Sequence, residues 1–182
     1  MSTRRGPASR RPFHLWTLGS TLFLAQRYAE ANARGLGMNV GGGMQFGTWG
    51  QALLGYSYDS GTLDISTGPK MPEEDFRTGQ FFARLTSDKL DNVYFPTKGH
   101  FGRIVYAVSR EDFGSDSDFD QAGLTYFHTY SWGRNTLIGG LDIKTTVDGD
   151  APIQNLYSLG GFLNLSGYEQ DELTGQQSGL AR

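Results

Sequence analysis

Alternation of apolar with small or polar residues is the feature that most limits what this chain can fold into. Between residues 36 and 46 the even positions are apolar apart from one glycine, and the odd positions are glycine, asparagine or glutamine. A period of two places one kind of side chain on each face of a β-strand. The alternation recurs in runs, mostly of about 8 to 12 residues, near positions 52–58, 79–86, 103–109, 121–130 and 137–144. The sequence therefore predicts an all-β, antiparallel fold.

The glycine content also favours strands over helices. The chain has 26 glycines among 182 residues, and 13% of its residues are aromatic. Glycine inside an element costs roughly 0.5–1 kcal/mol relative to alanine, so this many glycines suit turns and crowded sheet faces. The absence of cysteine excludes a disulfide scaffold and a thiolate metal site. A net charge of −3 provides no general basic surface, so we expect no nucleic-acid partner.

Strand length and the chemistry of the polar face favour a transmembrane β-barrel. A tilted strand needs roughly 9–11 residues to cross a bilayer, whereas strands of soluble proteins are mostly about 5–6 residues long. The face opposite the apolar one is rich in glycine, hydroxyl and amide residues, which suits a wet barrel lumen. Its charged members are Arg84, Arg103, Asp142 and Lys144. Aromatic residues near strand ends suit an interfacial girdle, and these are Trp49, Tyr58, Tyr130 and Trp132.

Along the chain, short connections between the alternating runs are followed by long ones, and long ones by short ones. Compact connections span 47–50, 92–99 and 131–135, and longer polar ones span 59–77, 110–118 and 147–175. Bacterial outer-membrane barrels have short periplasmic turns and longer outer loops, so this order predicts which end faces outward. We interpret residues 62–66, which also alternate, as a β-segment of a protruding loop. The count is then about seven spanning strands, if 16–24 is the first, and an eighth begins near Gln176.

The N-terminal residues 1–34 are separated from a barrel domain at 35–182. They are interpreted either as a first strand or as a signal-like region, because arginines precede a semi-apolar stretch and Ala29-Glu30-Ala31 has the form of a cleavage site. Both interpretations stay open. The chain contains no run of 18 apolar residues, which excludes a transmembrane helix.

Two motifs carry a resemblance to a known family. The first is the turn Leu90 to Gly99, whose motif residues are Asp91, Asn92, Phe95, Pro96, Thr97 and Gly99. The second is a glycine-rich stretch that we expect to be an ordered loop, formed by Leu159, Gly160, Gly161 and Phe162 and by Leu165, Ser166, Gly167 and Tyr168. Together they resemble the bacterial surface antigen family, the superfamily of outer-membrane assembly factors and two-partner secretion transporters. The turn Gly47 to Gly50 and the sequence Glu172 to Gly175 look most like the C-terminal barrel of patatin-like phospholipases.

The resemblance implies a structural role for each motif. It implies that 159–168 is an outer loop that folds back into the lumen and that 90–99 is a periplasmic turn. In the family an arginine before the loop glycine pairs with lumen acids, but Ser166 stands at that position here, which puts the assembly or secretion mechanism in doubt more than the fold. Related barrels have on the order of sixteen strands. We therefore expect a partial barrel of about seven or eight strands, truncated at its C-terminus, with a complete small eight-stranded barrel as the alternative.

The sequence contains no candidate catalytic residue. No Gly-x-Ser-x-Gly motif is present, so any phospholipase activity of patatin-like relatives would lie on a domain absent from this chain. The three histidines are scattered, and the Asp116, Asp118 and Asp120 series lacks the glycine and glutamate of a calcium loop. We expect no enzyme activity, no cofactor and no metal.

Two functions remain in play. The first is a bacterial outer-membrane barrel segment that anchors, and helps to translocate, a covalently linked passenger domain, with the lipid bilayer and the remainder of the barrel as its partners. Open strand edges would also allow pairing with a second copy. The alternative is a soluble β-sandwich or barrel that binds a ligand such as carbohydrate through Trp49 and Trp132. A sandwich would bury the face of Leu36, Val40 and Phe46, whereas a membrane barrel turns it outward.

Overall fold

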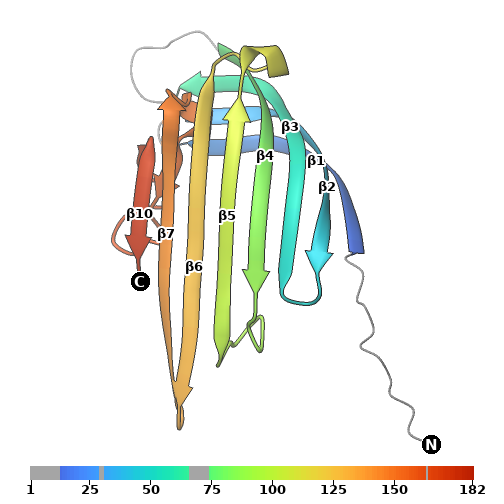
Figure 1. Cartoon of the computed structure of the whole chain (residues 1–182). Coiled ribbons are helices and arrows are strands. Elements are labelled where there is room, and N and C mark those ends of the chain that lie inside the picture. Colours follow the sequence, from blue (N-terminus) through green and yellow to red (C-terminus); the bar gives the residue numbers. More distant parts are fainter. Residues whose placement is uncertain (1–12, 29–30, 66–73, 163) are drawn as a thin grey trace, which may run out of the picture.

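A single antiparallel sheet dominates the computed structural model, which describes residues 13–28, 31–65, 74–162 and 164–182 (Figure 1). Its strands follow the order β1-β2-β3-β4-β5-β6-β7-β10. They are β1 (Phe13–Tyr28), β2 (Ala31–Phe46), β3 (Gly50–Ile65), β4 (Glu74–Asp88), β5 (Gly99–Ser109), β6 (Phe119–Trp132), β7 (Asn135–Gly149) and β10 (Gln177–Ala181). A second sheet pairs the short strands β8 (Tyr157–Leu159) and β9 (Leu173–Gly175). The predicted all-β, antiparallel fold is confirmed.

The large sheet is curved and open. From β1 to β7 each strand pairs with the next one in sequence, so the sheet is a chain of hairpins. Figure 1 shows the upper parts of β1, β2 and β3 bending across behind the other strands, which gives the sheet a concave side. Within the described residues, β1 and β10 are the two outer strands and do not pair with each other. The sheet therefore has the form of part of a barrel wall.

The two faces of the sheet differ in polarity, and the apolar face is the convex one. Leu54, Leu85 and Ile104 are 68%, 57% and 54% exposed, whereas Leu53 on the opposite face is 6% exposed. The soluble-sandwich alternative predicts burial of Leu36, Val40 and Phe46, yet these side chains are 46%, 50% and 37% exposed. In the part of the chain that the structure describes, no second large sheet covers them. The sandwich is therefore not favoured.

Phe82 interrupts the alternation in the sequence, and the structure supplies the reason. Phe82 pairs with Gly55 across β4 and β3 and lies on the concave face. A Cβ atom at Gly55 would lie 2.5 Å from the Phe82 ring. Because Gly55 has no side chain, the Phe82 ring fits on the concave face among mostly polar residues.

The prediction of a long polar loop at 59–77 is partly wrong. Strand β3 continues to Ile65 and β4 begins at Glu74, and their register extends to the pair Leu63 and Glu74. The alternation at 62–65 therefore belongs to a prolonged hairpin and not to a separate spanning strand. Residues 66–73 between the two strands lie outside the described residues.

The N-terminal segment is described only in part. The predicted first strand at 16–24 lies within β1, which pairs along its length with β2. The arginine-rich residues 1–12, and positions 29–30 of the expected cleavage site, fall outside the described residues. No helix in the described ranges is long and apolar enough to cross a membrane.

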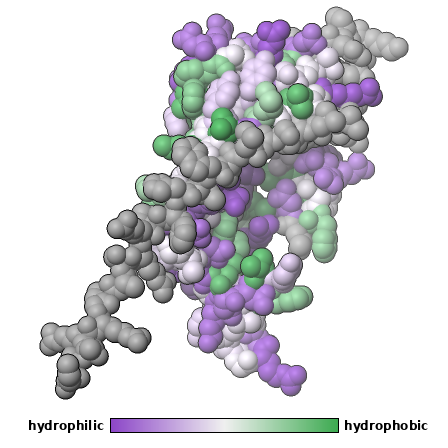
Figure 2. All heavy atoms as spheres, turned by 90° about the vertical axis from the view of Figure 1, so that its right-hand side faces the viewer, coloured by the Kyte–Doolittle hydropathy of each residue, from purple (hydrophilic) through white to green (hydrophobic). Residues whose placement is uncertain are grey.

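The connections after β2, β4 and β6 lie at one end of the sheet, which we call the short-turn end, and the connections after β5 and β7 lie at the other (Figure 1). The short-turn end carries exposed aromatic residues: Tyr130 and Trp132 stack with ring centroids 5.9 Å apart, and the Lys89 ammonium lies 5.4 Å from the Trp49 ring centroid. In the side view of Figure 2, hydrophilic residues gather at the upper and lower ends of the molecule. Amphipathic rings beside cationic side chains are typical of the boundary between hydrocarbon and water.

Replacing an outward apolar residue with arginine tests this division of the faces. Leu54→Arg is expected to destabilise the folded barrel in lipid by about 2–4 kcal/mol if the residue lies near the bilayer midplane. Ser57→Arg, on the same strand but on the concave face, is the matched control and is expected to cost much less. Urea unfolding in liposomes measures both, and equal costs for the two variants would contradict the assignment of the faces.

Candidate functional site

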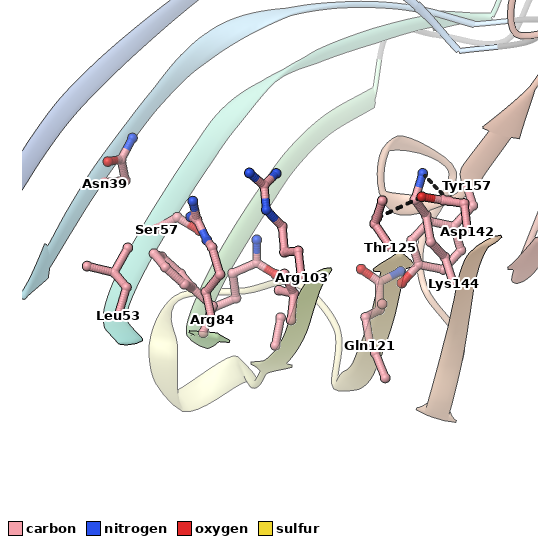
Figure 3. Close-up of a pocket in the computed structure, with 16 residues that line it drawn as sticks. Asn39, Leu53, Ser57, Arg84, Arg103, Gln121, Thr125, Asp142, Lys144 and Tyr157 are labelled. Atoms are coloured by element: carbon pink, nitrogen blue, oxygen red, sulfur yellow. Dashed lines mark hydrogen bonds and ion pairs between the residues drawn. The ribbon is translucent and has the colours of Figure 1, made fainter. Parts of the chain in front are cut away.

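The concave side of the sheet holds a polar hollow of about 850 Å³. Its lining comes from β2 to β7 and from Tyr157 of β8 (Figure 3). Amide, hydroxyl and charged side chains are interleaved with Leu53, Val105 and Ala107. The Gln80 side-chain oxygen is shielded from solvent and lacks a hydrogen-bond partner in the described part of the chain. A hollow with this lining suits water and polar solutes.

All four charges that the sequence predicts to share a face line this hollow. The Arg84 and Arg103 guanidinium groups lie 5.4 Å and 5.2 Å from the ring centroids of Phe82 and Phe101. On the opposite wall the Lys144 ammonium lies 3.3 Å from the Asp142 carboxylate. The Thr125 hydroxyl donates a hydrogen bond of 2.7 Å to the same Asp142 carboxylate. Figure 3 shows this pair across the hollow from the two arginines.

The connection after β7 returns to the concave face through Asn155, at the end of the short helix η2 (Ile153–Asn155). The Thr78 hydroxyl donates to the Asn155 side-chain oxygen over 3.1 Å, and the Gln121 amide donates to the Asn155 carbonyl over 2.8 Å. Tyr157 follows, and burial raises the pKa of its phenol to about 12. The connection thus bridges β4 and β6, and sequence reasoning did not single out Asn155.

Gln176 ties the two ends of the same connection together. Its side-chain amide donates to the Ala151 carbonyl, and its oxygen accepts hydrogen bonds from the Ala151 amide and the Thr146 hydroxyl. After this connection the chain forms strand β10, which pairs antiparallel with β7. No sequence motif marks this glutamine, so the contact could be found only in the folded chain.

The glycine-rich motif at 159–168 forms a compact loop. Gly160, Gly161 and Gly167 have φ values of 135°, 93° and 125°, which is backbone that favours glycine. The Gly161 amide donates to the Tyr168 carbonyl over 3.1 Å, and the Leu165 amide donates to the Gly161 carbonyl over 3.0 Å. Phe162 is 88% exposed, and Ser166, at the family's arginine position, is exposed as well. Among the described residues of this connection, Tyr157 lines the hollow.

The turn between β4 and β5 is held by two polar side chains. The Asp91 carboxylate accepts hydrogen bonds from the Thr97 and Lys98 amides and from the Thr97 hydroxyl. The Asn92 side-chain oxygen accepts from the Tyr94 and Phe95 amides over 2.8 Å and 3.1 Å. Phe95 is 82% exposed at the tip. Asp91, Asn92 and Thr97 therefore shape the turn through their side chains, and none of the motif residues lines the hollow.

The comparisons with known proteins agree with this architecture. The Omp85 superfamily domain matches residues 11–179, and the chain therefore belongs to the Omp85 superfamily. A similar solved structure is that of BamA from Haemophilus ducreyi lacking POTRA domains 1–3, with 18% sequence identity and a TM-score of 0.64. The match covers 86% of this chain and 35% of that one, so the chain spans about a third of the BamA structure's length. No curated protein sequence matches the chain.

The hydrogen bonds at Asp91 predict an unusually acidic carboxyl group. The Thr97 hydroxyl, followed by the Lys98 and Thr97 amides, lowers the pKa of Asp91 from 3.8 to about 2. A pKa lowered by folding stabilises the turn above pH 3.8, and this stabilisation is lost as the pH falls toward 2. In a carboxyl ¹³C titration we expect a midpoint of about 2 for Asp91, and a higher midpoint in Thr97→Ala. A midpoint near 3.8 in the unsubstituted protein would show that these contacts do not form.

Gly99 closes the same turn and tolerates no side chain. Its φ is 107°, and a Cβ atom would lie 2.0 Å from the Lys89 carbonyl oxygen. Gly99→Ala is expected to destabilise the folded protein by about 1–3 kcal/mol in urea unfolding. Gly102→Ala, on the same strand, is the control, because its Cβ would approach the Tyr126 ring no closer than 3.6 Å. Similar unfolding midpoints for both variants would disprove the steric account.

Proposed function

We propose that the chain forms part of the membrane-spanning wall of a bacterial outer-membrane β-barrel. The observation that carries the proposal is the opposite polarity of the two faces of one curved sheet. An apolar convex face suits contact with lipid, and a concave face with charged side chains suits an aqueous lumen. Membership of the Omp85 superfamily supports the same location.

The barrel wall serves to anchor a covalently linked passenger or partner domain and to help translocate it. The polar hollow provides the path, and the connection 150–176 narrows it from one side through Asn155 and Tyr157. In this proposal the loop Leu159 to Tyr168 obstructs the lumen without the arginine of the family, because Ser166 stands in its place. Asn155 supplies neutral hydrogen bonds to the wall instead.

The role proposed for this chain is structural and not enzymatic. Its partners are the outer-membrane lipid, the passenger domain and the remaining strands of the barrel. A closer relationship to the barrels of patatin-like phospholipases is proposed from the turn Gly47 to Gly50 and the sequence Glu172 to Gly175. Pairing of outer strands between two copies is the route to a homo-oligomer, since an unpaired strand edge offers free backbone groups.

Protease accessibility on intact cells tests both the location and the orientation. One variant of the full-length polypeptide carries a protease site inserted after Asp112, in the long connection, and its matched control carries the same site after Gly133, in a short turn. We expect both in the outer-membrane fraction, with external protease cutting only the first. Recovery in the soluble fraction would contradict the barrel, and cleavage of only the second variant would reverse the orientation.

A further inference from the structure

Arg84 and Arg103 are cations without a carboxylate partner in the described part of the chain. The two ion pairs found there are Arg110 with Asp120 and Lys144 with Asp142. Both arginines nevertheless line the polar hollow, on neighbouring strands β4 and β5. Their contacts with Phe82 and Phe101 hold the guanidinium groups beside aromatic rings and leave their charge in place.

The strand register brings the two arginines close together. Arg84 pairs with Val105, and Arg103 pairs with Thr86, so the two arginines are diagonal neighbours on one face. Diagonal neighbours in an antiparallel pair lie about 7–8 Å apart, which long side chains span easily. Figure 3 shows both side chains extending to the same side of the strands, into the hollow. Two guanidinium groups can therefore approach one ligand.

In the described residues no carboxylate forms an ion pair with either arginine. Asp88 on β4 pairs with Phe101 and is therefore also a diagonal neighbour of Arg103, but it is exposed at the end of the strand and its carboxylate accepts the Leu90 amide over 3.0 Å.

Asp142 is already matched by Lys144 on the opposite wall. Asp59 is the carboxylate on the concave side of β3, but it pairs with Thr78, whereas Leu53 is the residue that pairs with Arg84. Asp59 is six residues along β3 from Leu53, which stands opposite Arg84, and this separation is about 20 Å. The hollow is therefore electropositive around the two arginines.

We propose that Arg84 and Arg103 form a binding site for a compact phosphate-type anion inside the lumen. Each guanidinium offers a planar fork of donors that matches two phosphate oxygens, and two forks suit a polyvalent anion such as a diphosphate group. The hollow of about 850 Å³ lies within the size range of small-molecule sites. Because the site faces away from the apolar surface, its ligand is a free anion and not a lipid headgroup. The inference rests on the proposed barrel, whose lumen admits the anion.

Equilibrium dialysis with inorganic pyrophosphate tests the site on the full-length protein inserted in phosphatidylcholine nanodiscs. We expect Arg84→Gln combined with Arg103→Gln to weaken binding about tenfold or more, since both charge-assisted contacts are lost. Arg84→Lys combined with Arg103→Lys keeps both charges but loses the planar guanidinium forks. Its affinity for pyrophosphate is expected to lie between those of the unsubstituted protein and the glutamine double variant. Arg134→Gln, in a short turn, removes a charge outside the hollow and is expected to leave binding unchanged.

The other outcomes overturn the proposal. Absent binding by the inserted protein, or equal binding by the glutamine double variant, would exclude an anion site at these arginines. If Arg134→Gln lost as much pyrophosphate binding as the glutamine double variant, the anion would be attracted nonspecifically by positive charge and not bound at Arg84 and Arg103. Displacement of pyrophosphate by phosphatidylglycerol in the nanodisc would assign the site to a lipid headgroup. Insertion is scored separately by resistance of the folded protein to protease, so a failed anion site and a failed barrel give different results.

Discussion

The hydrogen bonds between neighbouring strands are the interaction on which the rest of this structure depends. A bilayer offers no water to a backbone amide, so a spanning strand must satisfy its polar groups through its neighbours. Successive hairpins from β1 to β7 supply those partners, and β10 extends the sheet beside β7. With the backbone satisfied in this way, the side chains are free to differ completely between the two faces. Leucine, isoleucine and tyrosine side chains cover the convex face, whereas arginine, glutamine and lysine point into the hollow.

The concave face shows how a membrane protein can hold charge next to hydrocarbon. Arg84 rests beside Phe82, and Phe82 itself fits because Gly55 stands opposite. The connection after β7 adds a second layer, since Asn155 joins β4 to β6 and Gln176 closes the connection at its base. These contacts combine a rigid wall with a polar interior, which is the combination that membership of the Omp85 superfamily leads one to expect.

Much of the wall could be predicted from the sequence, because a period of two is visible wherever one face of a strand is apolar. The alternation at 36–46 lies in β2, and the four charged residues of the polar face line one hollow. Prediction failed where polar residues form strands: residues 59–63 were expected in a polar connection, with a β-segment from 62, but they continue β3 by pairing with β4. Asn155 and Gln176 could not be found, because their roles depend on contacts between residues far apart in the sequence. The placement of 159–168 against the lumen remains a prediction.

The central claim is that the convex face meets lipid and the concave face meets water, and spin labelling measures this directly. A nitroxide is placed in turn at each position from 52 to 58 on β3, except Gly55, where a side chain would meet the Phe82 ring, in the full-length protein in liposomes. Its collision rates with oxygen, which concentrates in lipid, and with a water-soluble nickel complex are then recorded. We expect a period of two, with high oxygen access at Leu54 and Tyr56 and high nickel access at Ser57. Uniform access along the strand, or the opposite phase, would contradict it.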